Sequence, residues 1–410
     1  MKHPLRACII GISGFGENHY KALLQQAARD EMRAVGAVVV NQHETQEQCE
    51  RLRSLGAEIF TDYREMFSRL HGKVDFCFIP TGIHLHAPMA MAAMKAGAHA
   101  LVEKPLCGAI QDALAIQVCE KETGRRIVVG YNHMYAESTW EAKKTLHRLL
   151  GKINVIKWSR LNSRTDNYYA RNGWAGRLRA NDCWVLDSPF NNANAHQLNL
   201  LCFLAGNAPA QSASVKSVQA ELYRAVPGIE SADTACMRIL TKEGVTLYFH
   251  TTHCSSPTVQ DEVEARGEHG TVIWRGNRAF FAEKEKPETE IQLSFGIEKT
   301  ENIMDQVKRG IEGREAFCCD TTMAMAQTKC VNGAHESSPI HNVPQDQISR
   351  IPTEDSIRTE IRGIDHLMHQ AFQEEKLLSE TGVSWAKAGK MFSMEGYRHF
   401  SGGASASSGS

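Results

Sequence analysis

The chain has 410 residues, enough for two domains, and its 42% hydrophobic and 23% charged residues are typical of a globular protein. A net charge of −1 gives no sign of a polyanionic partner such as a nucleic acid. No stretch approaches the ~18 uninterrupted apolar residues of a membrane span, and no apolar leader precedes the first strand. Several of the twelve cysteines lie in apolar runs and none forms a Cys-x-x-Cys pair, which predicts reduced thiols in a cytoplasmic protein.

The first third of the chain alternates short apolar strands with helices. The predicted strands cover 6–11, 34–40, 57–60, 74–80, 98–102 and 126–131, and the predicted helices cover 17–28, 45–55, 62–70, 88–95 and 110–123. This alternation predicts an α/β fold with a doubly wound parallel sheet of the Rossmann type. In such sheets, ligands bind at the carboxyl ends of the strands.

A glycine-rich turn follows the first predicted strand, with the sequence Gly11-Ile12-Ser13-Gly14-Phe15-Gly16. Strand, glycine turn and helix N-terminus form the setting of a dinucleotide fingerprint, because the backbone must approach a pyrophosphate closely. Ser13 stands where the second glycine is usual, so a plain strand-to-helix turn is the alternative. The candidate cofactor residues of this turn are Gly11, Ser13, Gly14, Phe15 and Gly16.

Asn41 comes directly after the second predicted strand. An acidic residue at this point would accept hydrogen bonds from the adenosine ribose hydroxyls of NAD. The Asn41 amide can still bond a ribose and would not repel a 2′-phosphate, but no arginine follows it to bind one. The sequence therefore favours NAD and leaves NADP as an alternative, and Asn41 can equally be an ordinary turn residue.

Three later strands also end in polar residues. The fifth ends in Glu103 and Lys104, and Pro105 terminates it because proline cannot donate to a strand ladder. The fourth and sixth strands lead into Thr81-Gly82-Ile83-His84-Leu85-His86 and Tyr131-Asn132-His133. These three ends should converge with the glycine turn on one crevice. A purely structural ion pair is the alternative interpretation of Glu103 and Lys104.

Three of these motifs resemble the Gfo/Idh/MocA oxidoreductases, the family of glucose–fructose oxidoreductase and inositol dehydrogenase. They are the glycine turn followed by His19, the segment 84–88 (His-Leu-His-Ala-Pro) and the segment 102–106 (Val-Glu-Lys-Pro-Leu). The resemblance is strong over residues 5–135 and looser to about 345. It implies NAD binding, a homodimer or homotetramer, and cofactor contacts from Thr81, Gly82, His86, Glu103, Lys104 and Asn132. Gly82-Ile83 replaces the family's usual Pro-Asn, and His133 stands where arginine is more common.

After residue 135 the pattern changes to a helix at 137–150 and strands at 153–161, 234–241, 245–252, 262–266, 271–275 and 279–282. It predicts an α+β domain with a largely antiparallel open sheet. Further helices are predicted at 356–376 and 384–394. The segment Asn332–Glu336, with His341, is interpreted as a polar loop, so no metal is expected. The predicted domains are 1–132 for the dinucleotide, 133–400 for substrate and oligomerisation, and a flexible tail at 401–410.

His196 opens an apolar helix from within a run of amides. The family resemblance places an aspartate four residues before a catalytic histidine in this setting, and Asn192 falls on that aspartate. A carboxylate raises the basicity of a histidine, whereas an amide only orients it. Asp187, in the preceding loop, can restore the charge. The sequence predicts His196 as a general base, with a helix-capping histidine as the alternative.

A stretch upstream combines aromatic rings with hydrogen-bond donors, which suits the apolar faces and hydroxyl rims of a sugar. The candidate substrate residues are Arg164, Tyr168, Trp174 and Arg177 from this stretch, together with His133, Asp187 and Asn192. A subunit contact is the equal alternative, since Tyr, Trp and Arg concentrate at interfaces.

The resulting hypothesis is NAD(P)-dependent oxidation of a secondary hydroxyl on a sugar, glycoside or cyclitol. His196 would remove the hydroxyl proton, and Lys104 would stabilise the charge that develops on the same oxygen. One alternative is an NAD-dependent glycosidase that acts by transient oxidation and elimination. A further alternative is a non-catalytic sensor that binds a dinucleotide.

Overall fold

The computed structural model describes residues 3–258 and 260–404. Its chain divides into two compact units: the first takes the residues up to 107, 111–137 and 297–324, and the second takes 108–110, 138–296 and 325 onward. The sequence analysis placed 297–324 in the second domain because it follows that domain's strands, whereas its contacts place it in the first unit. Residues 405–410 of the predicted tail lie outside the described residues.

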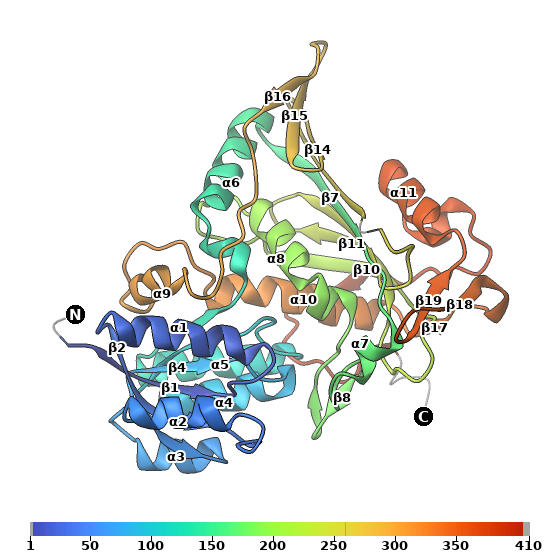
Figure 1. Cartoon of the computed structure of the whole chain (residues 1–410). Helices are drawn as coiled ribbons and strands as arrows, with labels where there is room; N and C mark the ends of the chain where they lie inside the picture. The colour runs from blue at the N-terminus through green and yellow to red at the C-terminus, as the bar shows by residue number, and fades with distance from the viewer. Residues whose placement is uncertain (1–2, 259, 405–410) are drawn as a thin grey trace. The chain divides into compact units, whose positions relative to one another are not determined.

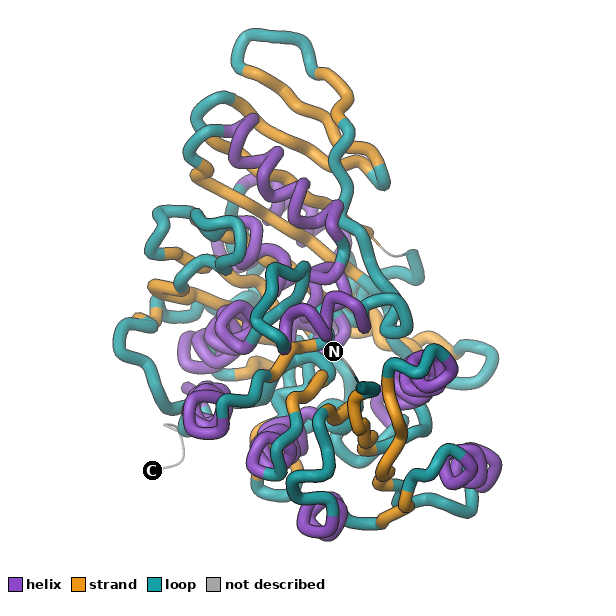
Figure 2. Tube along the Cα trace, turned by 90° about the vertical axis from the view of Figure 1, so that its left-hand side faces the viewer, coloured by secondary structure: helices purple, strands orange, loops and turns teal. Residues whose placement is uncertain are grey.

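The first unit contains a six-stranded sheet in the order β3-β2-β1-β4-β5-β6, parallel throughout, which confirms the predicted doubly wound fold. Helices lie on both sides of its strands (Figures 1 and 2). The strands are β1 (Leu5–Ile10), β2 (Met32–Val38), β3 (Glu58–Phe60), β4 (Phe76–Ile79), β5 (His99–Val102) and β6 (Ile127–Val129). The helices are α1 (Gly16–Ala28), α2 (Gln46–Ser54), α3 (Tyr63–Arg69), α4 (Ile83–Lys95), α5 (Ile110–Thr123), η1 (Asn132–Tyr135) and α9 (Met304–Ile311).

The strand order reverses between β1 and β4, which lie side by side in the sheet although two strands separate them in the chain. At such a reversal the connecting segments leave in opposite directions and open a crevice at the carboxyl edge. The buried runs Cys8–Ile10, Phe76–Ile79 and Ala100–Val102 explain why these strands are central, since both faces of a parallel sheet are covered. The fold therefore brings the glycine turn and the end of β5 to the same edge.

The helix after β4 begins earlier than the sequence analysis predicted. It starts at Ile83, with Gly82 as its N-cap, and Pro88 lies inside it rather than at its start. Proline is common in the first turn because it lacks an N–H, and this preference led to the predicted start at residue 88. Most of the predicted loop at 81–86 is therefore the first turn of α4.

The second unit contains a ten-stranded sheet in the order β16-β15-β14-β13-β7-β12-β11-β10-β17, with β20 paired to β10. Its pairs are antiparallel except β7–β12 and β10–β17, which matches the predicted largely antiparallel sheet. Its strands are β7 (Ile153–Leu161), β10 (Val215–Arg224), β11 (Thr234–Thr241), β12 (Thr246–Thr252), β13 (Gln260–Gly267), β14 (Gly270–Arg275), β15 (Arg278–Glu283), β16 (Thr289–Ile291), β17 (Ile340–Asn342) and β20 (Phe392–Ser393).

The remaining elements of this unit are two strand pairs and several helices. The strand pairs are β8 (Arg179–Ala180) with β9 (Cys183–Trp184), and β18 (Ile348–Pro352) with β19 (Ile357–Ile361). The helices are α6 (Glu137–Leu150, which starts in the first unit), α7 (Asp166–Ala170), the π-helical turn η2 (Pro189–Ala193), α8 (Ala195–Leu204), α10 (Thr321–Ser337, which also starts in the first unit), η3 (Gln345–Gln347), α11 (Ile364–Glu374) and η4 (Leu378–Thr381).

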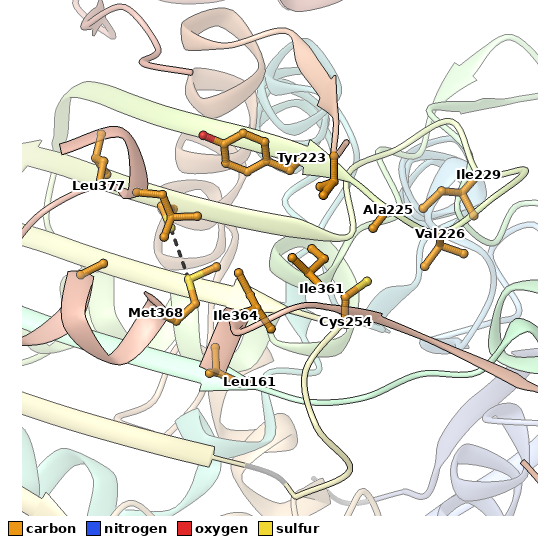
Figure 3. Packing of buried hydrophobic residues seen from close by; sticks show 14 residues of the cluster. Leu161, Tyr223, Ala225, Val226, Ile229, Cys254, Ile361, Ile364, Met368 and Leu377 are labelled. Atoms are coloured by element: carbon orange, nitrogen blue, oxygen red, sulfur yellow. Dashed lines mark hydrogen bonds between the residues drawn. The ribbon is translucent and has the colours of Figure 1, made fainter. Parts of the chain in front are cut away.

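Helices α8 and α11 pack on opposite faces of the ten-stranded sheet. Lys157 of β7 reaches α11, where its Nζ donates to the Phe372 carbonyl at 3.1 Å. Thr251 of β12 points to the other face, where its hydroxyl accepts a 2.8 Å bond from the side-chain amide of Asn194, the residue that precedes α8. The α11 face is sealed by a buried apolar cluster that includes Leu161, Tyr223, Ile361, Ile364, Met368 and Leu377 (Figure 3).

The two helices predicted at 356–376 and 384–394 are wrong. Residues 356–376 form strand β19 followed by helix α11, and Gly363, at a φ of 72°, separates the two. Ile357, Thr359 and Ile361 alternate with polar residues, which is the period of a strand, and β19 pairs with β18. Residues 384–394 form no helix and contain only β20. The helical composition of these segments concealed the glycine break.

The segment Asn332–Glu336 is also different from its prediction, because it lies within helix α10 rather than in a loop. Asn332 is buried and holds the chain before α5: its Oδ1 accepts from the Ile110 N–H at 2.8 Å, and its Nδ2 donates to the Gly108 carbonyl at 2.9 Å. His335, one turn further along, packs against the rings of Phe190 and Phe400. This polar run is therefore part of the interior.

Burial of His335 predicts an acid-sensitive contribution to stability. Desolvation lowers its pKa from 6.5 to about 4, so the unfolded chain binds more protons than the folded chain between those two values. Stability is then lost as pH falls through this window, by up to roughly 3 kcal/mol. We expect His335→Gln to lose less stability than the wild type between pH 7 and pH 5.

The measurement is urea unfolding followed by tryptophan fluorescence, since all six tryptophans belong to the second unit. His366→Gln, at an exposed position on α11, is the matched control and should keep the wild-type pH profile. If the wild type and His335→Gln have parallel profiles, His335 does not carry this dependence.

No helix in the described ranges 3–258 and 260–404 has the length and hydropathy needed to cross a membrane.

Candidate cofactor and substrate site

The glycine turn has the shape that a pyrophosphate requires. Gly11 and Gly14 adopt φ values of +90° and +57°, which side chains disfavour. A Cβ on Gly16 would lie 2.7 Å from the Gly11 carbonyl oxygen, whereas a Cβ on Gly14 would meet no atom within 4 Å. The turn is thus closed on the side of the protein and open at Gly14, and α1 begins immediately after it. This arrangement fits an anionic diphosphate at a helix N-terminus.

Glu103 ties the end of β5 to the glycine turn's helix. Its Oε1 lies 2.8 Å from Nε2 of His19 on α1, and its Oε2 accepts from the Lys104 N–H at 3.1 Å. Gly130, at the end of β6, leaves room for this carboxylate, because a Cβ there would lie 2.8 Å from Glu103 Oε1. Glu103 and His19 are both buried. The pair fixes the backbone that carries Lys104 at the carboxyl edge of the sheet.

The sequence analysis predicted that His86 contacts the cofactor directly, but in the structure both of its ring nitrogens contact the backbone. It is buried, with Nδ1 at 2.7 Å from the Pro105 carbonyl and Nε2 at 3.0 Å from the Thr81 carbonyl. Burial lowers the pKa of His86, so it is neutral and donates its single N–H to one of these carbonyls. Both ring nitrogens face the backbone, so His86 joins the end of β4 to the residue after Lys104.

Two polar atoms at this edge are buried and have no hydrogen-bond partner within the described part of the chain: Oγ1 of Thr81 and Nδ1 of His84. Buried polar groups are almost always paired, so two orphans beside the glycine turn's edge indicate where a ligand would bond. Gly82 lies between them as the N-cap of α4. These atoms fit a bound dinucleotide, and His84 was not among the predicted site residues.

The remaining predicted residues of the first unit lie at the same edge or near it. Asn41 follows β2, and its Nδ2 donates to Glu44 Oε2 at 2.7 Å, so the amide has a neighbouring acid. Asn132 begins η1, and its carbonyl accepts from the Glu298 N–H at 3.4 Å. His133 is buried in the same turn. Phe15, in contrast, is 54% exposed at the tip of the glycine turn.

In the second unit, Asp187 is a buried carboxylate with three partners. Its Oδ2 accepts from the Gly176 N–H at 2.6 Å and lies 3.4 Å from Arg171 Nη2, and its Oδ1 accepts from Asn192 Nδ2 at 2.7 Å. The structure therefore brings Asp187 to Asn192, the residue that the resemblance placed on the family's acid. The negative charge is present here, but Arg171 balances it.

The predicted sugar-binding stretch is compact. The guanidinium carbons of Arg164 and Arg171 lie 5.0 and 3.9 Å from the centroid of the Tyr168 ring, and Arg171 lies 5.3 Å from Trp174. Arg177 has a different partner from the other arginines of this stretch: it donates to Glu230 Oε1 at 2.6 Å. Four of the predicted substrate residues, Arg164, Tyr168, Asp187 and Asn192, are thus linked through Arg171.

His196 is the second residue of α8, directly after the Asn194 cap. The turn before it is π-helical, with Ser188 as its N-cap. Lys104 belongs to the first unit and His196 to the second.

Sequence reasoning missed two further residues of these clusters. Arg171 lay in the aromatic stretch but was not assigned a contact, and His253 follows β12 with no local signal. His253 is buried, its Nδ1 lies 2.9 Å from the Tyr169 hydroxyl, and burial holds its pKa well below the usual value. Among the described residues, no group of three or more His, Cys, Asp or Glu side chains could hold a metal.

Comparison with known proteins places the first unit in a family. Residues 5–131 match the family described as oxidoreductases with an NAD-binding Rossmann fold, Gfo/Idh/MocA. The chain is 28% identical over 96 residues to the 1-carboxy-3-chloro-3,4-dihydroxycyclo hexa-1,5-diene dehydrogenase of Comamonas testosteroni, covering 23% of this chain and 24% of that protein. It is 28% identical over 145 residues to an inositol 2-dehydrogenase/D-chiro-inositol 3-dehydrogenase of Lactiplantibacillus plantarum, covering 35% and 40%. These matches span less than half the length of either relative.

Among solved structures, the fold is similar to the WlbA dehydrogenase of Bordetella pertussis in complex with NADH and UDP-GlcNAcA. The TM-score is 0.65 and the identity 21%, over 81% of this chain and 95% of that one. This likeness extends the shared fold to both units. The match to the Gfo/Idh/MocA oxidoreductases with an NAD-binding Rossmann fold is confined to residues 5–131, within the first unit, and the second unit lies outside it.

Proposed function

We propose that the protein is an NAD-dependent oxidoreductase that acts on a secondary hydroxyl of a sugar, glycoside or cyclitol. The observation that carries the proposal is the placement of Lys104 at the carboxyl end of β5, on backbone fixed by the Glu103–His19 pair. Glu103 bonds His19 and the Lys104 N–H, so the pair holds the end of β5 in place. At this position the proposal assigns the Lys104 ammonium to the substrate oxygen, whose developing negative charge it would stabilise.

The residues divide the work as follows in this proposal. The glycine turn and the buried polar atoms of Thr81 and His84 bind the dinucleotide. When bound, NAD supplies the hydride acceptor. Lys104 Nζ hydrogen-bonds the reacting oxygen, and the imidazole of His196 takes its proton at Nε2, since Nδ1 is buried. The cyclitol and dihydroxy-ring dehydrogenases among its relatives support a hydroxylated ring as substrate.

The test is to incubate the purified protein with NAD and a panel of sugars, cyclitols and aryl glycosides. The absorbance of reduced nicotinamide and the release of the aglycone are followed together. Formation of NADH without release supports the dehydrogenase. No turnover and no release with any member, despite measurable NAD binding, would contradict an enzyme of this class and support a dinucleotide-binding sensor.

One observation favours keeping a second candidate, a glycosidase that oxidises transiently and eliminates the leaving group. The residue matched to the family's acid is Asn192, and its amide donates to Asp187, whose charge Arg171 balances. An amide at position 192 can orient a histidine but does not raise its basicity as a carboxylate would. Aglycone release without net NADH is the result expected for this candidate in the same experiment.

The family resemblance also supports a homodimer or homotetramer, which we propose for the assembly. In the second unit, α11 and the segment through Leu378 cover one face of the sheet. A second copy of the chain would then pack against another surface. Sedimentation velocity of the purified protein measures the number of copies.

A further inference from the structure

Arg164, Tyr168, Arg171 and Trp174 form a cluster in the second unit that we call the arginine–aromatic cluster. Both guanidinium groups lie against the same phenol ring, with carbon-to-centroid distances of 5.0 Å for Arg164 and 3.9 Å for Arg171. Like charges repel, so two guanidiniums on one ring need a compensating negative charge nearby. The question is whether the protein supplies that charge.

The protein supplies one carboxylate for the two arginines. Arg171 Nη2 lies 3.4 Å from Asp187, which also accepts from the Gly176 N–H and from Asn192. Within the described residues, no acidic side chain lies within ion-pair distance of Arg164. The Nε of Arg164 is buried and has no hydrogen-bond partner in that part of the chain.

Three titratable groups face the cluster from neighbouring elements. His253 packs edge-on against Tyr168, with ring centroids 5.2 Å apart, and is neutral because burial and the two arginines lower its pKa. Burial raises the pKa of Tyr168, so its hydroxyl keeps its proton. Asp233, whose charge acts on the adjacent Tyr169, is held by the Ala225 and Val226 N–H groups and the Thr234 hydroxyl, so within the described residues Arg164 has no carboxylate in ion-pair contact.

The residues around the cluster are joined by hydrogen bonds and an ion pair. The Arg164 N–H donates to the His253 carbonyl at 3.0 Å, and the Tyr169 hydroxyl bonds His253 Nδ1 at 2.9 Å. Asp166, at the start of α7, forms an ion pair with Arg350. A charge fixed in advance on such a scaffold binds a ligand with little loss of conformational entropy.

We infer that Arg164 and Arg171 bind an oxyanion substituent of the substrate, so that the substrate is an acidic sugar: a uronate or a sugar phosphate. A guanidinium presents paired N–H donors that match two oxygens of a carboxylate or phosphate, and Arg164 Nε is one such donor. This inference rests on the proposed function, because it names the substrate class of the same oxidoreductase.

The experiment compares matched substrates and variants. Methyl β-glucoside, methyl β-glucuronide and glucose 6-phosphate are offered with NAD to the wild type, Arg164→Gln and Arg164→Lys. Arg278→Gln, on β15 and paired with Glu290, is the control for the same substitution elsewhere. Isothermal calorimetry with glucuronate and with inorganic phosphate measures binding without any need for turnover.

We expect the wild type to prefer one acidic sugar, and Arg164→Gln to reduce that preference about 10–100-fold, mainly through KM. Arg164→Lys should restore part of it, and Arg278→Gln should behave as the wild type. The uronate and phosphate arms identify which oxyanion is used. A preference for the uronate alone assigns a carboxylate, and a preference for the phosphate alone assigns a phosphate.

The outcomes separate this inference from the function it rests on. Equal turnover of neutral and acidic sugars overturns the oxyanion site and leaves the oxidoreductase intact. Arg164-dependent binding of glucuronate or phosphate, with no NADH from any sugar, supports the site and counts against the oxidoreductase. Binding that is unchanged in Arg164→Gln overturns the inference.

Discussion

Replacing Lys104 with methionine is expected to lower kcat of the proposed oxidation by about 10²–10⁴-fold. Methionine keeps the length and the apolar stem of lysine and removes the ammonium, so the oxygen of the substrate loses its donor. The dissociation constant for NAD should change far less, because the glycine turn and Thr81 remain. Turnover is measured by NADH absorbance, and NAD binding is measured by calorimetry on the same preparation.

Lys95→Met is the matched control, since Lys95 is exposed at the end of α4 in the same unit. It should turn over as the wild type does. A Lys104→Met protein with wild-type kcat would remove Lys104 from the chemistry and leave a structural lysine. Loss of NAD binding in parallel with loss of turnover would instead assign Lys104 to the cofactor.

Replacing Lys157 with methionine is expected to destabilise the second unit by about 3–5 kcal/mol. Lys157 is buried on β7, with its Nζ 3.2 Å from Glu264 and 3.7 Å from Glu375, and it donates to the Phe372 carbonyl. Removing the lysine leaves two partly buried carboxylates with Arg266 as their remaining partner. Loss of one member of a buried ion network costs more than loss of a surface pair, because the remaining charges keep their desolvation penalty.

Urea unfolding by tryptophan fluorescence measures this change, because every tryptophan belongs to the second unit. Lys286→Met is the control: Lys286 pairs with Glu283 on the surface at 2.6 Å, and such pairs contribute ~0–1 kcal/mol. If the two variants unfold at the same urea concentration, the network around Lys157 does not hold α11 to the sheet.

The first unit could be predicted from the sequence because its signals are local. The short apolar run Phe76–Ile79 ends at Pro80 and lies in a stretch that alternates strands with helices, which favours a buried parallel strand. The same reasoning could not place residues 297–324 in that unit. Their contacts, such as the 3.2 Å bond from Lys308 to Gln26, join positions far apart in the chain.

In the second unit, the sequence-based prediction differs from the structure where the composition of a segment suits more than one kind of secondary structure. Residues 356–376 are rich in helix-forming side chains, yet Gly363 at positive φ divides them into a strand and a helix. Asn332–Glu336 looked like a loop because it is polar. It lies within α10, where the Asn332 side chain bonds the backbone at Gly108 and Ile110.

The sequence names candidate site residues but not their contacts. Glu103 and Asn192 were expected from motifs and Asp187 from its place in the preceding loop, whereas the pairing of Glu103 with His19 and of Asp187 with Arg171 was not expected. Motif spacing gives the identity of a side chain at a strand end. Which neighbour neutralises it depends on packing from distant segments, as with Asp187 and Arg171.

The packing of α11 against the sheet has a practical meaning for how the chain can be shortened. Ile361, Ile364, Met368 and Leu377, which all follow Ile357 in the chain, pack in one buried apolar cluster with Leu161 and Tyr223 (Figure 3). A protein truncated before Ile357 would expose the remaining residues of this cluster to water as a continuous apolar patch. Such a fragment should precipitate during purification, so a tag or fusion partner is better joined after the final helix than in its place.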